Sequence, residues 1–145
     1  MKILVKKLRP DAQLPAAGSQ YAAGYDLRAC MDAPVEIPPH TTAKIGTGLS
    51  IAVPEGYFGA IFARSGLATK QGLRPANCVG VCDSDYRGEY IISLHNDSGD
   101  TQTVSPGDRI AQLVLLPCMA AEFEAAEALP ETERGAGGFG STGVG

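Results

Sequence analysis

The sequence predicts a single all-β domain with one short helix, and three observations support this fold class. Short runs rich in β-branched and aromatic residues recur along the chain, helical periodicity is almost absent, and Gly and Pro residues separate the runs. Short strands joined by tight turns are typical of a β-sandwich or a β-barrel. A chain of 145 residues has room for one domain with a real core, so we treat residues 1–145 as one domain.

Eight runs are predicted to form strands of about five residues each. The turn signals between them have steric causes: Pro fixes φ, Gly accepts φ > 0, and Asn, Asp and Ser bond to nearby backbone groups. Pro38-Pro39 and the segments 54–56, 96–100 and 105–108 are of this kind. The predicted strands are residues 3–8, 35–37, 41–45, 49–53, 57–62, 90–95, 101–104 and 110–116.

The remaining segments include one predicted helix and a Gly-rich tail. In residues 65–72, the Ser65 hydroxyl can cap the first turn, helix-forming residues follow, and Gly72 closes the segment. Residues 134–145 hold the densest cluster of the 18 glycines and cannot bury a core. We expect this tail to be mobile on its own, and its one Arg and one Phe indicate a role in closing over a ligand.

Composition and charge narrow the class of protein. Hydrophobic residues make up 44% and charged residues 19%, as in an ordinary globular protein. The net charge of −4 disfavours stable nucleic-acid binding through a general basic surface but leaves room for a small anionic ligand. Two lysines interrupt the start of the chain and no apolar run is long enough to span a membrane. We therefore expect a soluble, cytoplasmic protein without a membrane segment.

The cysteines and histidines argue against a disulfide framework and against a zinc site. The cysteines show neither CxxC spacing nor the density of a disulfide-rich protein, so we expect reduced, buried thiols. Neither HxH nor HExxH occurs, and any metal should be a hard cation held by oxygen. The residues concerned are Cys30, Cys78, Cys82 and Cys118, with His40 and His95.

The tail is close to two phosphate-binding patterns but fits neither. Residues 135–140 formally match GxGxxG, yet no helix of a βαβ unit can follow, and no Lys precedes Ser141 as a P-loop requires. Flexible backbone N–H groups, two hydroxyls and Arg134 are nonetheless compatible with phosphate. A disordered linker is the alternative interpretation of the same composition.

Four further segments carry residues suited to catalysis or ligand binding, and each can also be explained by a purely structural role. Arg64, Ser65 and Gly66 stand at the start of the predicted helix, where unpaired N–H groups favour an anion or where Ser65 simply caps the helix. Asp83 and Tyr86 follow an apolar run at 77–82, as in a site at a strand end or as in a plain turn. The segments 23–27 and 107–113 are uninformative when taken singly.

Taken together, the five segments resemble the five motifs of the trimeric dUTPase family in order, content and separation. They span residues 23–143, and coincidence does not account for the match. One departure is Cys82, where the family usually has a branched aliphatic residue, but a buried thiol packs as a small hydrophobe. The matching segments read AGYDL (23–27), RSGLA (64–68), GVCDSDYRG (80–88), GDRIAQL (107–113) and RGAGGFGSTG (134–143).

The resemblance implies a jelly-roll-like fold, a distorted β-barrel, and a homotrimer with three sites shared between subunits. It also implies magnesium-dependent hydrolysis of dUTP to dUMP and pyrophosphate, which limits uracil in DNA and supplies dUMP for dTMP synthesis. The Gly-rich arm at 134–145 would then close over the site of a neighbouring subunit.

The same resemblance assigns roles in the hydrolysis to individual residues. Asp83 is the general base for the attacking water, and Asp26 holds magnesium through water. Ser65 lies near the oxygen that bridges the α- and β-phosphorus, where negative charge develops as the bond breaks. The other phosphate-contacting residues are Arg64, Gly66 and Gln112.

Further implied roles concern the base, the sugar and the arm. Asn77 and backbone groups around Val81 bind uracil on a narrow hairpin, 73–83, that leaves no room for a C5 methyl. Tyr86 packs on the deoxyribose and excludes a 2′-hydroxyl. In the arm, Phe139 stacks on uracil. The remaining substrate-contacting residues of the arm are Gly140 and, on the γ-phosphate, Arg134, Ser141 and Thr142.

Three alternatives remain open at this point: a dCTP deaminase of the same fold, a regulatory protein that senses dUTP, and a purely structural jelly roll. The deaminases do not ordinarily carry the full 83–88 segment together with the Phe139 arm. Binding of dUTP without turnover would indicate the sensor. A structural protein has no reason to combine Arg64, Asp83 and a Gly-rich tail that contains Phe.

Overall fold

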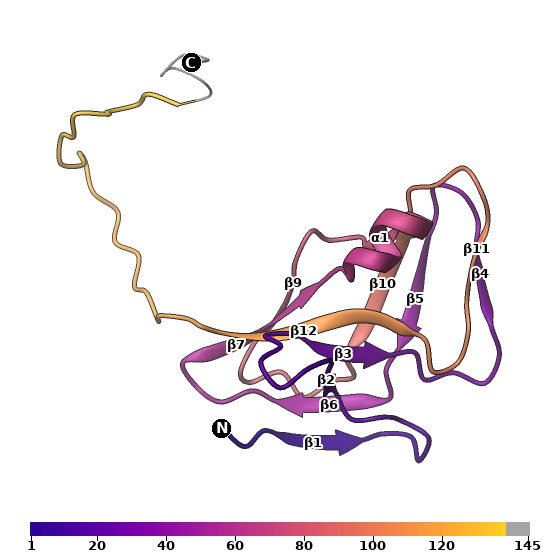
Figure 1. Cartoon of the computed structure of the whole chain (residues 1–145). Helices are drawn as coiled ribbons and strands as arrows, with labels where there is room; N and C mark the ends of the chain where they lie inside the picture. The colour runs from indigo at the N-terminus through magenta and orange to yellow at the C-terminus, as the bar shows by residue number, and fades with distance from the viewer. Residues whose placement is uncertain (139–145) are drawn as a thin grey trace.

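The computed structural model describes residues 1–138, and it confirms the predicted all-β class with a single short helix (Figure 1). All eight predicted strands are present, each within one or two residues of its predicted bounds. The strands are β1 (Leu4–Lys7), β2 (Ala16–Ala17), β3 (Tyr25–Arg28), β4 (Val35–Ile37), β5 (Thr42–Gly46), β6 (Leu49–Ala52), β7 (Tyr57–Phe62), β8 (Leu73–Pro75), β9 (Gly80–Cys82), β10 (Ile91–Asn96), β11 (Gln102–Val104) and β12 (Arg109–Pro117), and the helix is α1 (Ser65–Gln71).

The strands form four antiparallel sheets whose order does not follow the sequence. The largest sheet has the order β2-β3-β12-β7-β9, the next has the order β5-β10-β8, and β1-β6 and β11-β4 are pairs. The long strand β12 is the centre of the largest sheet, because it pairs with β3 on one side and with β7 on the other. In this register Gln112 lies between Asp26 and Phe62. The segments 23–27 and 107–113 therefore meet in the sheet, and the segment 64–68 begins two residues after Phe62.

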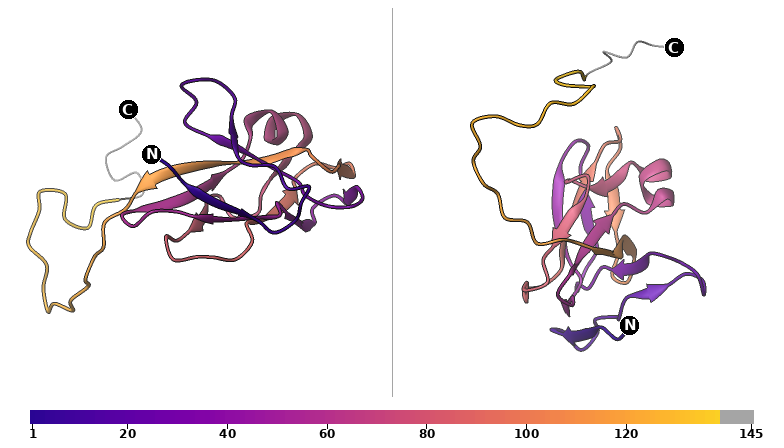
Figure 2. Two further views of the ribbon diagram at one scale, coloured as in Figure 1. Left: turned by 90° about the horizontal axis from the view of Figure 1, so that it is seen from below. Right: turned by 90° about the vertical axis from the view of Figure 1, so that its left-hand side faces the viewer.

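One hydrophobic core joins these sheets. Leu27, Ile45, Ile51, Leu94 and Ile110 are almost completely buried, and they come from strands of three different sheets. Burying each side chain of this size stabilises the fold by about 1.5–3 kcal/mol. The views in Figure 2 show the strands gathered in one layered body, with α1 on its outside.

The helix α1 confirms the predicted segment but corrects the predicted cap. The N-cap residue is Arg64, in an extended conformation and without a side-chain capping bond, so Ser65 is the first helical residue and not the cap. Gly72 ends the helix as predicted: its φ is 68°, and its N–H donates to the carbonyl of Ala68. The left-handed conformation explains why glycine closes this helix.

Two further expectations are corrected by the structure. The segment 73–83 is not a hairpin of paired strands, because β8 pairs with β10 while β9 pairs with β7 in another sheet. The four cysteines are free, as expected, but only Cys30 and Cys82 are partly buried. Cys78 and Cys118 are exposed, because they lie in the loop before β9 and just after β12 and not in the core.

The chain leaves the body of the fold after β12. The N–H of Cys118 donates to the carbonyl of Gly56, and from there to residue 138 the chain contains neither helix nor strand. We call residues 118–133 the acidic linker, because it holds five glutamates and almost every residue in it is exposed. It extends away from the sheets in both figures. Within the described part of the chain, no helix has the length and apolar character needed to cross a membrane.

Candidate active site

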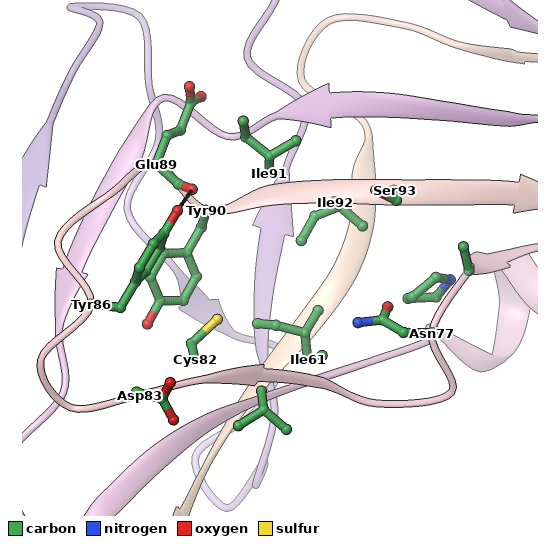
Figure 3. A pocket seen from close by; sticks show the side chains of 14 residues that line it. Ile61, Asn77, Cys82, Asp83, Tyr86, Glu89, Tyr90, Ile91, Ile92 and Ser93 are labelled. Atoms are coloured by element: carbon green, nitrogen blue, oxygen red, sulfur yellow. Dashed lines mark hydrogen bonds between the residues drawn. The ribbon is translucent and has the colours of Figure 1, made fainter.

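A pocket of about 500 Å³ lies where the β7–β9 edge of the largest sheet faces β8 and β10 of the second sheet (Figure 3). This volume is within the range of sites that bind small molecules. Its walls are mostly apolar, and most of its polar groups come from the loops on either side of β9. The lining residues are Ile61, Pro75, Ala76, Asn77, Gly80, Val81, Cys82, Asp83, Tyr86, Glu89, Tyr90, Ile91, Ile92 and Ser93.

Four of the predicted site residues line this pocket. Asn77 and Asp83 lie at opposite ends of it, with Val81 of β9 between them in the sequence. Asp83 directly follows β9, as predicted, and its carbonyl accepts the N–H of Tyr86 at 3.2 Å, which turns the chain back toward the pocket. Asp83 is exposed, so water has access to its carboxylate.

The Tyr86 side chain has a fixed position at the Asp83 end. Its hydroxyl donates to the backbone carbonyl of Glu89 at 2.9 Å. Its ring also faces the ring of Tyr90, with the centroids 6.1 Å apart and the planes tilted by 49°. Such tilted aromatic pairs are favourable, so Tyr86 is supported on two sides.

The floor of this end of the pocket is uncharged at neutral pH. Burial raises the pKa of the Cys82 thiol, and the charge of Asp83 also raises it, against the opposing effect of the Tyr90 hydroxyl. Burial likewise raises the pKa of Tyr90 far above its ordinary value, and the nearby Cys82 adds to this shift. Asp83 therefore stands beside a neutral thiol and a neutral phenol.

A second group of predicted residues surrounds Asp26. Arg64 Nε donates to Asp26 Oδ1 at 2.8 Å, and Arg109 Nη1 donates to Asp26 Oδ2 at 3.2 Å. The Asp26 side chain is only 17% exposed. Two guanidinium groups on one carboxylate leave a local excess of positive charge, which suits phosphate oxygens.

Arg109 was missed by the sequence analysis as a member of this group. Its place in the segment 107–113, beside Gln112, is the one signal that could have identified it. Its ion pair with Asp26 joins residues 83 positions apart in the chain.

Gln112, Ser65 and Gly66 lie close in the fold to the Asp26 group. Gln112 Nε2 donates to the carbonyl of Ala63 at 2.8 Å, directly before Arg64. A Cβ at Gly24 would lie 2.5 Å from Gln112 Oε1. The absence of a side chain at Gly24 therefore makes room for the Gln112 side chain. Ser65 and Gly66 are exposed in the first turn of α1, and a Cβ at Gly66 would meet open space.

The chain does not bring all predicted residues together. None of the predicted residues at or near Asp26 lines the pocket beside β9. These residues are Asp26, Arg64, Ser65, Gly66 and Gln112. Arg134 belongs to the extended part after the acidic linker, where its Nε donates to the carbonyl of Gly137 at 2.8 Å. The predicted arm residues Phe139, Gly140, Ser141 and Thr142 lie outside the described residues.

The metal-binding capacity of the described residues is limited. Among residues 1–138, no group of three or more His, Cys, Asp or Glu side chains could hold a metal ion. The donor set therefore does not suit a metal held entirely by protein. It does suit Mg²⁺, which keeps several waters and binds through one or two carboxylates together with substrate phosphates.

The fold and the site together define a class: a β-sheet protein with a pocket for a small molecule and an arginine group for phosphate. Over residues 10–143 the sequence matches the dUTPase family. The deoxyuridine 5'-triphosphate nucleotidohydrolase of Coxiella burnetii (strain Dugway 5J108-111) is 48% identical over 144 residues, which cover 99% of this chain and 95% of that protein. The chain belongs to the dUTPase family.

Solved structures agree with this assignment. A mutant dUTPase of Staphylococcus bacteriophage 80alpha with dUpNHpp is similar to this chain with a TM-score of 0.89 and 29% identity, covering 99% of each chain. A mutant dUTPase from phage phi11 of S. aureus, described for its coordination of a structural Mg(II) ion, has a TM-score of 0.78 and 25% identity, covering 88% of this chain and 98% of that one. The expected jelly-roll-like fold is thereby confirmed.

Proposed function

We propose that this dUTP diphosphatase hydrolyses dUTP to dUMP and pyrophosphate by attack of a water, activated by Asp83, on the α-phosphorus. The observation that carries the proposal is the place of Asp83 at one end of the pocket, with its carboxylate open to water. A carboxylate within hydrogen-bond reach of a water can orient it and remove its proton. The removal of dUTP limits uracil in DNA, and the dUMP formed is available for dTMP synthesis.

The base and the sugar occupy the pocket in this proposal. β9 is an edge strand, so about half of its backbone N–H and C=O groups point away from β7 and are free to pair with the edge of uracil. Asn77 and the backbone around Val81 make this pairing in the proposal. In support, both residues line the pocket, and Asn77 lies at the end opposite Asp83. Tyr86 packs on the deoxyribose and leaves no room for a 2′-hydroxyl.

The phosphates bind to the group around Asp26. Arg64 and Arg109 neutralise phosphate charge, and the exposed Ser65 hydroxyl and the Gly66 N–H stabilise the leaving pyrophosphate. Gln112 contributes its amide. Since this group lies outside the pocket of its own chain, we propose a homotrimer in which the pocket of one subunit meets the Asp26 group of another.

Mg²⁺ is the proposed cofactor, and when bound it neutralises the charge of the triphosphate. Asp26 is the carboxylate that would hold it, through water. The same carboxylate orients Arg64 and Arg109, so it positions two cations for the phosphates in addition to its role toward the metal. These ion pairs are half-buried and matter for geometry more than for stability.

The Gly-rich arm completes the proposed site from a neighbouring subunit. Phe139 stacks on uracil, Gly140 allows close approach, and Ser141 and Thr142 bind the γ-phosphate with Arg134. Closure of this kind excludes water and holds the reacting groups in place. The acidic linker is exposed and without helix or strand, which allows the arm to reach the site of a neighbouring subunit.

The decisive experiment is pyrophosphate release from dUTP, dTTP, dCTP and UTP, with magnesium and with EDTA. We expect turnover of dUTP alone, reduced by EDTA. The Asp83→Asn variant, which keeps the size and shape of the side chain, should bind dUTP and lose turnover by roughly a hundredfold or more. Tight binding of dUTP by the wild-type chain without any turnover would favour the sensor, and release of ammonia from dCTP would favour the deaminase.

A further inference from the structure

We propose that Gly88 is a positioning residue for nucleotide selectivity: it has no side chain so that the Tyr86 ring can lie folded back across the backbone. The inference rests on the proposed function, in which Tyr86 contacts the deoxyribose. It adds a residue that touches no substrate itself and acts only through the position of that ring.

The geometry at Gly88 is tighter than at any other glycine among the described residues. A Cβ built there would lie 2.3 Å from the Tyr86 hydroxyl oxygen, 2.6 Å from Cζ and 2.9 Å from Cε2. Distances below 3.0 Å are essentially never found for a real Cβ. Any side chain at position 88 therefore has to displace the end of the Tyr86 ring.

The backbone itself does not require glycine at this position. Gly88 is not among the glycines with positive φ, which are Gly48, Gly56, Gly72, Gly107 and Gly135. An alanine can adopt its backbone conformation without strain. The Tyr86 ring is thus the only obstacle to a side chain at position 88. In this respect Gly88 differs from the glycines that adopt a positive φ in turns.

The Tyr86 ring is held by two groups that are themselves fixed in the fold. The carbonyl that accepts the Tyr86 hydroxyl belongs to Glu89, whose carboxylate accepts the N–H of Gly48 at 2.7 Å. Tyr90, which supports the ring face, is only 2% exposed, and its backbone N–H and carbonyl bond to Leu49 and Thr47. Figure 3 shows Tyr86 and Tyr90 lying side by side at this end of the pocket, beside Asp83.

The Tyr90 ring, and not its hydroxyl, provides this support. Within the described residues the Tyr90 hydroxyl is buried without a hydrogen-bond partner. A Tyr90→Phe variant keeps the ring, so the ratio of kcat/KM for dUTP over UTP should fall less than in a Tyr90→Leu variant. A Tyr90→Leu variant removes the aromatic face that Tyr86 packs on, and it should weaken the selectivity.

The test measures kcat and KM for dUTP and for UTP in the Gly88→Ala variant. Gly99→Ala is the matched control, because Gly99 also lacks a positive φ and a Cβ there meets open space. We expect the ratio of kcat/KM for dUTP over UTP to fall roughly tenfold or more in Gly88→Ala and to stay unchanged in Gly99→Ala. The KM for dUTP should rise more than kcat falls. The melting temperature should stay near that of the wild type, since only the tip of one exposed side chain has to move.

A double-mutant cycle shows whether the effect passes through Tyr86. In a Tyr86→Leu background the clash is absent, so Gly88→Ala should cause no further loss of selectivity. Additive losses, an unchanged ratio in Gly88→Ala, or a Gly88→Ala chain that fails to fold would each overturn the inference. If the wild-type chain itself failed to turn over dUTP, the proposed function would fail. If it turned over dUTP and UTP equally well, the role of Tyr86 would fail.

Discussion

At the scale of single residues, Asp26 shows how one carboxylate organises distant parts of the chain. It lies on β3, it binds Arg64 at the start of α1, and it binds Arg109 at the start of β12. Asp26 and Arg64 could be named from the sequence, because each lies in one of the five motifs. It could not show that they form an ion pair, because pairing across 38 and 83 residues depends on the strand order.

The cysteines allow a prediction at this scale. Burial raises the pKa of both Cys30 and Cys82, so their reactive thiolates form only at higher pH than usual. Iodoacetamide at about pH 8.5, the ordinary pKa of a thiol, should label the exposed Cys78 and Cys118 first. Labelling of the other two thiols should rise only as the pH increases further. Mass spectrometry of the labelled chain measures each site separately.

Labelling in urea is the control for this prediction. Once the chain is unfolded, all four thiols should react at similar rates. Equal labelling of Cys82 and Cys78 in the folded chain near pH 8.5 would show that Cys82 is not shielded.

At the scale of elements, a single buried amide joins two sheets. Asn96, at the end of β10, is completely buried and donates to the carbonyls of Ile37 in β4 and of Asp100, each at 2.8 Å. Its oxygen accepts both the N–H and the hydroxyl of Ser98. The amide therefore fixes the 96–100 turn and ties it to the β4–β11 pair.

Replacing this amide should destabilise the fold strongly. An Asn96→Ala variant leaves buried carbonyls and an N–H unpaired and removes packing, so we expect a loss of about 3 kcal/mol in the free energy of unfolding. Urea unfolding measures this loss. Gln20→Ala is the matched control, because Gln20 is also an amide but is exposed, and it should stay within about 0.5 kcal/mol of the wild type. An Asn96→Ala chain with the wild-type midpoint would contradict the role of the network.

The sequence predicted most of the strands, including the three-residue strands β4 and β11. Each of the eight predicted runs became a strand, because apolar and β-branched residues with turn signals on either side mark a half-buried strand clearly. The strands β2 (AA) and β3 (YDLR) were not predicted, because they contain no β-branched residue. The strands β8 and β9 were expected only as parts of the hairpin at 73–83. The false hairpin at 73–83 arose because local pattern cannot tell which sheet each strand joins.

At the scale of the whole molecule, the predicted site is divided. The pocket with Asn77, Asp83 and Tyr86 and the group around Asp26 are separate parts of one chain. The motifs predicted the members of both parts except Arg109, whereas only the structure shows which members lie together. The division explains why an isolated subunit would be a poor catalyst in the proposed mechanism and why assembly would be part of the chemistry.

Mixing two inactive chains tests this division. One chain carries Asp83→Asn, and the other lacks residues 134–145. If the arm of one subunit serves the pocket of another, a trimer from an equal mixture should contain intact sites, and roughly one site in four should regain activity. The two chains are co-expressed with different tags, particles that contain both are purified, and their dUTP turnover is measured.

Two controls accompany the mixing experiment. Each variant alone should remain folded and assembled, because neither change touches the buried core. A mixture that stays inactive although both chains are in the same particle would mean that each arm serves its own pocket.

The acidic linker has a consequence for how the activity can be lost. No core side chain lies in residues 118–133. Within residues 1–138, the last backbone hydrogen bond that ties the chain to the sheets is the one at Cys118. A protease that cuts one peptide bond in this exposed stretch would detach the proposed arm and leave every strand pairing intact. The cleaved molecule would keep its shape and its resistance to heat while turning over almost no substrate. Proteolysis would therefore inactivate this enzyme without first unfolding it.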